Sequence, residues 1–140
     1  MIRSGSRLSL AHYPDIPIEF HIGFSVDKLQ SLAHSIDLFV LTSLVEGFGL
    51  VILENMACGL PVIATPHSGA PDVIEEGRHG FIIPIRSAEA LAEKLAWGIE
   101  HRQELFEMGQ AAAVQAQRFS WTQFRRNIQN AYCSMIAEVS

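Results

Sequence analysis

Long apolar runs are missing from this sequence. The longest of them, such as residues 38–41, are far shorter than the roughly 20 residues that a membrane-spanning helix requires. Residues 1–6 also lack the apolar stretch of a secretory signal. We therefore expect no transmembrane segment and a cytoplasmic location, while a peripheral contact with a membrane stays open for a full-length protein.

Positive charge is scarce as well. Ten Lys and Arg residues stand against 15 Asp and Glu residues, which gives a formal net charge of −5. Binding to the phosphate backbone of a nucleic acid demands a stripe or patch of basic side chains, and the sequence has none. Nucleic acid is therefore not an expected partner.

Fingerprints of metal and common nucleotide sites are also missing. Cys58 and Cys133 stand far apart, and the six histidines form no His-x-x-x-His pattern. We expect two reduced, buried thiols, no metal site and no cofactor. The lack of Gly-x-Gly-x-x-Gly disfavours a generic dinucleotide domain, and the lack of Gly-Lys-Ser/Thr excludes a P-loop. His67 and His79 receive no role, because lone loop histidines are usually solvated.

What the sequence does contain is an alternation of short apolar runs and helical periods. Apolar residues make up 49% of the 140 residues, enough to bury a single core. Ser25, Ser87 and Ser120 are expected helix N-caps, and Gly59 is an expected helix stop. The spacing predicts strands at residues 16–23, 38–42, 61–65 and 81–85, helices at about 26–36, 50–58, 88–99, 102–117 and from 121 onward, and one helical turn at 73–76.

Such alternation is typical of an α/β fold with a Rossmann-like parallel sheet. The strands are near-continuous apolar runs, as in sheets covered by helices on both faces. We expect about four strands flanked by helices, followed by a helical C-terminal region. Its last helix should turn one face to the core, made of Trp121, Phe124, Ile128, Tyr132, Ile136 and Val139.

Ligands of parallel α/β sheets bind at the carboxyl ends of the strands. In the predicted sheet these ends are residues 23–25, 43–49, 65–71 and 84–87. One of these segments contains Glu46, so the fold prediction alone already draws attention to this residue.

Glu54 is the second acid of interest. Its helical neighbours three and four positions away are Leu50, Val51, Ala57 and Cys58, all apolar. We therefore expect Glu54 to lie off the solvated face, and a buried carboxylate requires a partner or a ligand. The alternative, that backbone groups or a core arginine satisfy it, stays open.

Between the two acids lies a glycine-bracketed helix start. Gly47 and Gly49 flank Phe48, so the backbone can turn tightly and approach a ligand closely. The amides of residues 49–51 would be the unpaired donors of a helix N-terminus, which favours an anion such as a diphosphate. Glu46 taken singly could be an ordinary loop acid, but the combination is less common.

These residues carry a family resemblance. Glu46 and Glu54, with seven residues between them and Gly47-Phe48-Gly49-Leu50 inside, resemble the E-x7-E signature of the group-1 glycosyltransferase family with the GT-B fold. The resemblance continues through residues 54–65, 69–74, 77–84 and 118–121, and it covers roughly residues 18–132. It implies that residues 16–140 are a partial nucleotide-sugar-binding domain, preceded by an irregular segment at 1–15.

The resemblance implies a role for each site residue. Glu54 would hold the ribose hydroxyls of a nucleoside diphosphate sugar, and the amides of Leu50 and Val51 would contact its diphosphate. Glu46, with the backbone of Phe48 and Gly49, would face the transferred sugar. Most members of the family transfer a hexosyl group with retention, through an oxocarbenium-like transition state and without a catalytic metal. A carboxylate near developing positive charge fits electrostatic stabilisation.

The sequence departs from the family in two ways. Ser68 replaces one glycine of a frequent Gly-Gly pair and Asp72 replaces a glutamate, which changes the reach of the side chains at that loop. A basic pair that reaches the diphosphate and an N-terminal acceptor-binding domain are also absent, and Arg3 and Arg7 do not take the place of that pair. We therefore expect an N-terminally truncated domain that transfers weakly or not at all alone.

Two further interpretations stay open. The chain could be a non-catalytic binding or assembly module that keeps the fold. A phosphorylase or epimerase of the same fold is the third possibility, which the Gly-Phe-Gly-Leu segment disfavours. Expected partners are a nucleotide sugar, a missing acceptor-binding domain or partner chain, and further copies of the same chain, because an incomplete sheet leaves an edge and apolar surface exposed.

Overall fold

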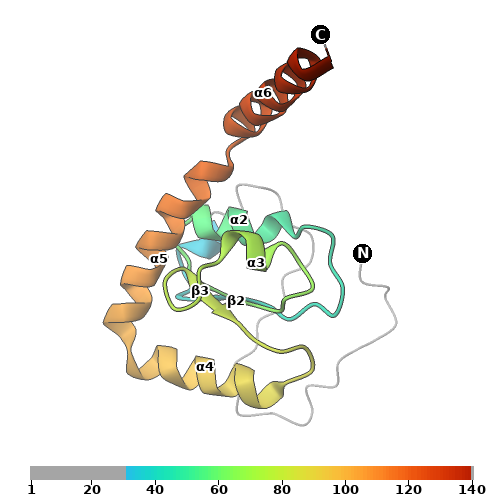
Figure 1. Ribbon diagram of the computed structural model, residues 1–140. Coiled ribbons are helices and arrows are strands. Elements are labelled where there is room, and N and C mark those ends of the chain that lie inside the picture. Colours follow the sequence, from blue (N-terminus) through green and yellow to red (C-terminus); the bar gives the residue numbers. More distant parts are fainter. Residues whose placement is uncertain (1–30, 140) are drawn as a thin grey trace.

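The computed structural model describes residues 31–139, with side chains up to residue 136 (Figure 1). The predicted strand at 16–23, the Ser25 cap and the segment 1–15 lie outside the described residues. The described elements are β1 (Phe39–Leu41), α2 (Leu50–Ala57), β2 (Val62–Ala64), α3 (Ala70–Val73), β3 (Gly80–Ile82), α4 (Ala88–Glu100), α5 (Arg102–Ala116), η2 (Gln117–Phe119) and α6 (Trp121–Val139).

The predicted parallel sheet is confirmed, with three strands in the described part of the chain. Their order is β1-β2-β3, and both pairings are parallel. In the register, Val40 pairs with Ile63, which in turn pairs with Phe81. Consecutive strands that lie side by side in parallel require the crossover helices that the sequence supplies between them.

Both faces of the sheet are covered, as the continuous apolar strands predict. Val62 and Ala64 point into a core shared with α2, α3 and α5. Ile63 points to the opposite core, which includes Phe81 and which α4 covers. In Figure 1, α2 and α3 lie on one side of the strands and α4 on the other.

Local signals set most element ends. Gly59, at φ 83°, follows α2, and the Leu60 N–H donates to the Asn55 carbonyl, which closes the helix as predicted. Ser87 caps α4 by accepting a hydrogen bond from the Ala90 N–H. Ser120 caps α6 in the same way through the Gln123 N–H. The caps therefore lie where the sequence predicts them.

Two predictions about helices are wrong. The turn expected at residues 73–76 is α3, three residues earlier, because Pro71 favours the first turn of a helix. The expected core face of α6 is exposed instead: more than half the surface of Trp121, Phe124, Ile128, Tyr132 and Ile136 is accessible. The physical reason is that α6 projects away from the sheet, so no described element covers this face (Figure 1). The Val139 side chain lies outside the described side chains.

Candidate functional site

The loops that follow β1 and β2 lie side by side at the carboxyl edge of the sheet. Four hydrogen bonds join residues 43–48 to residues 65–69. At the two ends, the Thr65 hydroxyl donates to the Ser43 carbonyl, and the Gly69 N–H donates to the Phe48 carbonyl at 2.8 Å. The middle pair involves His67, whose Nδ1 lies 2.9 Å from the Leu44 carbonyl and whose carbonyl accepts from the Glu46 N–H at 3.0 Å.

Glu46 lies in this loop, exposed at the edge where sequence analysis predicts a ligand. Its Oε1 accepts a hydrogen bond from the Gly47 N–H at 3.1 Å. A Cβ at Gly49 would lie 3.2 Å from the Glu46 Cγ, so the acid packs directly over the start of α2. The glycine-bracketed loop thus brings one carboxylate close to the first turn of a helix.

Gly49 is the N-cap of α2, and its backbone is left-handed at φ 74° and ψ 59°. Glycine reaches this conformation without the penalty that a Cβ imposes. Gly49 has no side chain that could cap the helix. The backbone amides of Leu50 and Val51, at the start of α2, therefore have no side-chain acceptor from the N-cap residue. The predicted helix start is therefore present in the structure, without a side-chain cap.

The prediction that Glu54 is buried is wrong. Its side chain is exposed, and among the described residues its carboxylate has no hydrogen-bond or ion-pair partner. The apolar neighbours used for the prediction are themselves accessible, since Leu50 is 54% exposed and Ala57 is also exposed. The buried polar residue of α2 is instead Asn55, whose Nδ2 donates to the Val51 carbonyl at 2.8 Å.

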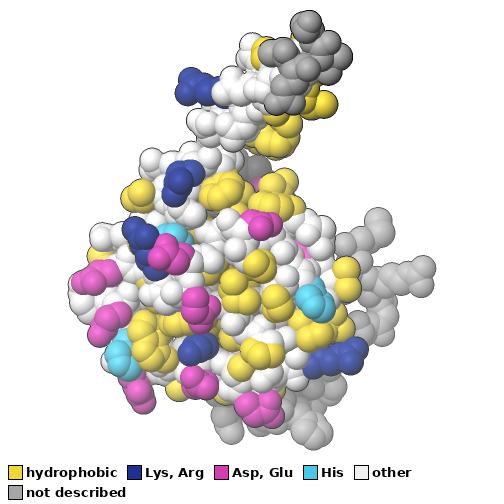
Figure 2. Space-filling model, in the orientation of Figure 1, with side chains coloured by type: hydrophobic (Ala, Val, Ile, Leu, Met, Phe, Trp, Pro, Cys, Tyr) yellow, Lys and Arg dark blue, Asp and Glu magenta, His cyan; other side chains and the backbone are white. Residues whose placement is uncertain are grey.

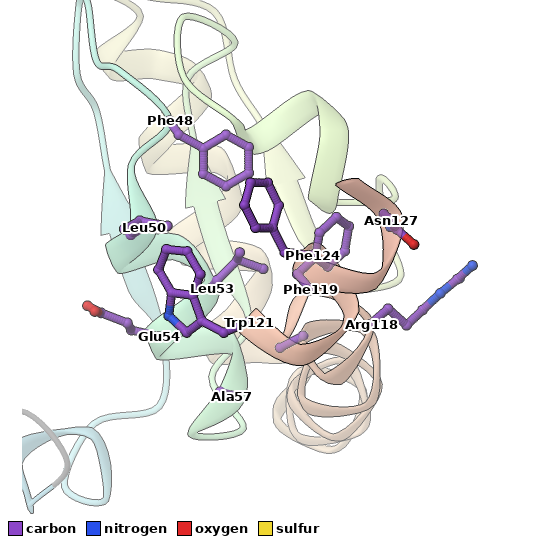
Figure 3. A pocket seen from close by; sticks show the side chains of 11 residues that line it. Phe48, Leu50, Leu53, Glu54, Ala57, Arg118, Phe119, Trp121, Phe124 and Asn127 are labelled. Atoms are coloured by element: carbon purple, nitrogen blue, oxygen red, sulfur yellow. The ribbon is translucent and has the colours of Figure 1, made fainter. Parts of the chain in front are cut away.

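A cavity of about 570 Å³ brings part of the predicted site together. Phe48, Leu50 and Glu54 line it, whereas Glu46, Gly49 and Val51 do not. The opposite wall is aromatic, with Phe119, Trp121 and Phe124 (Figure 3). In that view the Glu54 carboxylate points away from the aromatic side chains, toward the outside of the cavity.

A second cavity, of about 300 Å³, opens at the carboxyl edge on the α4 side of the sheet. Its lining includes Thr42, Thr65, Arg86 and Ser87. Arg86 has φ 57°, and among the described residues it is the non-glycine with a positive φ. No pattern in the sequence predicts this conformation at Arg86, because a positive φ is uncommon for a residue with a Cβ.

The two loop histidines differ from each other. His67 is exposed as predicted, and its ring forms a hydrogen bond with the Leu44 carbonyl. His79 is 3% exposed, so the prediction of a solvated ring is wrong for it. Its Nδ1 accepts the Glu75 N–H, and burial together with the nearby Arg78 guanidinium lowers its pKa below 6.5.

Neither cysteine forms a disulfide in the described part of the chain. Cys58 is half-buried, whereas Cys133 is exposed, so the expectation of a buried thiol is wrong for Cys133. Within residues 31–139 no three His, Cys, Asp or Glu residues are grouped closely enough to hold a metal ion. None of the described helices is long and apolar enough to cross a membrane.

Comparisons with known proteins identify the family of this chain. Residues 9–115 match the family model described as glycosyl transferases group 1. The chain belongs to this family. Among curated members, D-inositol 3-phosphate glycosyltransferase of Arthrobacter sp. (strain FB24) is 35% identical over 116 residues, which are 83% of this chain and 27% of that protein.

Solved members of the group 1 glycosyl transferases share the fold. Anabaena HepE in complex with UDP-glucose has a TM-score of 0.68 and 32% identity, over 81% of this chain and 31% of that one. The C-terminal domain of a group 1 family protein from Francisella tularensis (LpcC) has a TM-score of 0.63 and 30% identity, over 69% of this chain and 50% of that one.

Two conclusions follow for this group 1 glycosyl transferase chain. Its three-stranded parallel sheet with flanking helices is a Rossmann-like unit of the GT-B fold. It also spans only about a quarter of the length of the curated relatives it matches.

Proposed function

We propose that this chain is the donor-binding part of a retaining hexosyltransferase whose donor is a nucleoside diphosphate sugar. The observation that carries the proposal is the start of α2, where Gly49 leaves the helix without a side-chain cap between Glu46 and the exposed Glu54. Such helix starts favour phosphate groups. The similarity to HepE, which is solved with UDP and with UDP-glucose, makes UDP-hexoses the first donors to test.

The diphosphate and the ribose would bind along α2. The amides of Leu50 and Val51 would stabilise the diphosphate, because the first turn of a helix presents N–H donors and a positive dipole end. Glu54 lies one helical turn further, a rise of roughly 6 Å. Its carboxylate is exposed, and it would accept hydrogen bonds from the two ribose hydroxyls.

Glu46 would act on the transferred sugar, together with the backbone of Phe48 and Gly49. We assign Glu46 and Glu54 to the E-x7-E motif on this basis. As the glycosidic bond to the diphosphate lengthens, positive charge develops on the sugar and negative charge on the leaving group. A fixed carboxylate stabilises the first charge and the helix amides the second, so electrostatic preorganisation supplies the catalysis without a metal ion.

The acceptor site would come from another domain or a partner chain. The relative from Arthrobacter is about three times as long as this chain, and the described carboxyl edge offers few cations for a diphosphate. We therefore expect weak or absent transfer by the isolated chain. Robust transfer from UDP-glucose to an added acceptor would contradict this part of the proposal.

A second candidate function, as a non-catalytic assembly module, is supported by the exposed face of α6. Trp121, Phe124, Ile128, Tyr132 and Met135 follow helical spacing along one side, and each exposes more than half its surface. Figure 2 shows apolar side chains gathered along one side of the projecting helix. These five offer on the order of 600 Å² per copy, not far below the roughly 800 Å² per partner of a standard interface. We propose that a second copy of the chain covers this face.

Calorimetric titration separates the two candidates. We expect UDP and UDP-glucose to bind the wild-type chain and Glu54→Ala to weaken both at least tenfold, because both ligands carry the ribose. Glu104→Ala, which removes an exposed acid in the first turn of α5, is the matched control and should bind like wild type. Unchanged binding by Glu54→Ala would refute the ribose assignment, and no binding by wild type would favour the assembly module.

A further inference from the structure

We infer that His67 is a positioning residue that holds the Glu46 carboxylate where a donor sugar would meet it. The contact between Glu46 and a sugar rests on the proposed function. The restraint of the Glu46 loop by His67 rests on hydrogen bonds alone. No role for this residue follows from the sequence pattern, in which it is a lone loop histidine.

Packing alone does not hold the loop that carries Glu46. Leu44 is 47% exposed, Val45 is 85% exposed and Phe48 is 41% exposed. A segment with so little buried apolar surface opens easily unless hydrogen bonds restrain it. The position of Glu46 must therefore depend on the four bonds to residues 65–69.

His67 supplies both bonds in the middle of this loop. Its ring Nδ1 lies 2.9 Å from the Leu44 carbonyl, and its own carbonyl accepts the Glu46 N–H at 3.0 Å. The two hydrogen bonds restrain the backbone on either side of Val45. Without the ring, the bonds at Ser43 and Phe48 still hold the ends, but the segment from Leu44 to Glu46 loses one of its two hydrogen bonds to His67.

The ring must act as the donor, because a carbonyl oxygen can only accept. Nδ1 carries a proton both in the imidazolium ion and in one neutral tautomer, so the contact does not require a charged ring. Asparagine places its amide nitrogen the same number of bonds from Cα as Nδ1. His67→Asn should therefore keep the contact, whereas His67→Leu keeps bulk and removes the donor.

The first measurement needs no ligand. Amide hydrogen exchange on the full chain should be about fivefold faster for Glu46 in His67→Leu, the factor that corresponds to one net hydrogen bond. Exchange of the Ile63 amide in the core should stay unchanged, and His67→Asn should match wild type within twofold. Equal exchange at Glu46 in wild type and His67→Leu would overturn the inference.

The second measurement compares UDP with UDP-glucose by calorimetry. Only the sugar nucleotide reaches Glu46. His67→Leu should therefore weaken the binding of UDP-glucose about fivefold and leave the affinity for UDP unchanged. In a Glu46→Ala background the same substitution should have no further effect, because the group it positions is gone. Equal weakening of both ligands would show a merely structural role and overturn the inference.

Failure of the proposed function gives a different pattern. In that case wild type binds neither UDP nor UDP-glucose, and the exchange rate of the Glu46 amide alone decides whether His67 holds the loop. Faster exchange in His67→Leu, with no ligand bound by wild type, would support the role of His67 in restraining the loop and refute the contact of Glu46 with a donor sugar. Unchanged exchange would discard both.

Discussion

Four glycines, three at the site and one at the far end of α2, allow backbone strain and steric contact to be measured separately. Gly59 has φ 83° and open space where a Cβ would stand, so alanine there meets strain alone. Gly49 has φ 74° and a Cβ position 3.2 Å from Glu46 Cγ, so alanine there meets strain and a neighbour. Gly47 has an ordinary φ and open space, which makes it the matched control.

The magnitudes follow from the conformations. Left-handed backbone costs a residue with a Cβ about 1–2 kcal/mol, so Gly59→Ala should lower the free energy of unfolding by that amount. Gly49→Ala should lose the same amount or slightly more, because a side chain can move by a few tenths of an ångström. Gly47→Ala should be neutral or slightly stabilising, since it only reduces the freedom of the unfolded chain.

Gly69 tests contact without strain. Its φ is −73°, but a Cβ there would lie 2.6 Å from the Phe48 carbonyl oxygen and 2.7 Å from the Phe48 ring. The backbone of residues 46–48 must therefore shift to admit alanine, and the Gly69–Phe48 hydrogen bond should weaken. We expect Gly69→Ala to reduce UDP-glucose binding at least fivefold, a loss comparable to one net hydrogen bond.

Urea denaturation followed by circular dichroism measures the stabilities, and calorimetry measures the affinities. We expect Gly59→Ala to lose stability while its affinity for UDP-glucose stays unchanged, because Gly59 lies at the far end of α2. Gly49→Ala and Gly69→Ala should both lose affinity. If Gly59→Ala weakened UDP-glucose binding as much as Gly49→Ala does, the loss of stability alone would explain the loss of affinity. The reasoning about the loop would then be refuted.

Two further predictions concern other parts of the chain. Light scattering should show that Ile128→Asp reduces self-association, while Asn130→Asp, which adds the same charge on the opposite side of α6, does not; a wild type that stays monomeric at high concentration would refute the interface. The free energy of unfolding should be constant above about pH 7 and fall below pH 6.5, because the unfolded His79 ring binds a proton there and the folded ring, whose pKa is lowered, does not. Denaturation at several pH values should show a flatter profile for His79→Asn, which keeps an acceptor for the Glu75 N–H, and an equally steep profile would count against this explanation.

The sequence predicted the sheet well because its strands are constrained on both faces. Val62, Ile63 and Ala64 are all fully buried, so every position of β2 had to be apolar and the run could be recognised. The helix stop at Gly59 and the caps at Ser87 and Ser120 were equally predictable, since each depends on one residue and its own neighbours.

The site was predictable only where local sequence determines it. The glycine-bracketed start of α2 is a local property, and it forms as predicted. The hydrogen bonds of His67 and the burial of His79 depend on segments brought together by the sheet; His67 and its partner Leu44 are 23 positions apart along the chain. No pattern within either segment records such a contact.

The two largest errors, at Glu54 and on α6, have the same physical cause. Both predictions inferred burial from apolar spacing, and Glu54, Trp121 and Phe124 border the same cavity of about 570 Å³. Periodicity shows that a helix has an apolar face, but it does not say whether that face is covered within the same chain. Leu50 and Trp121 both line this cavity, and both remain more than half exposed (Figure 3). An apolar surface of this kind, next to a carboxylate that points to solvent, is costly to leave in water and favours coverage by another molecule. Because Phe48 and Leu50 belong both to the cavity and to the proposed donor site, whatever covers α6 must also affect the access of a donor to α2.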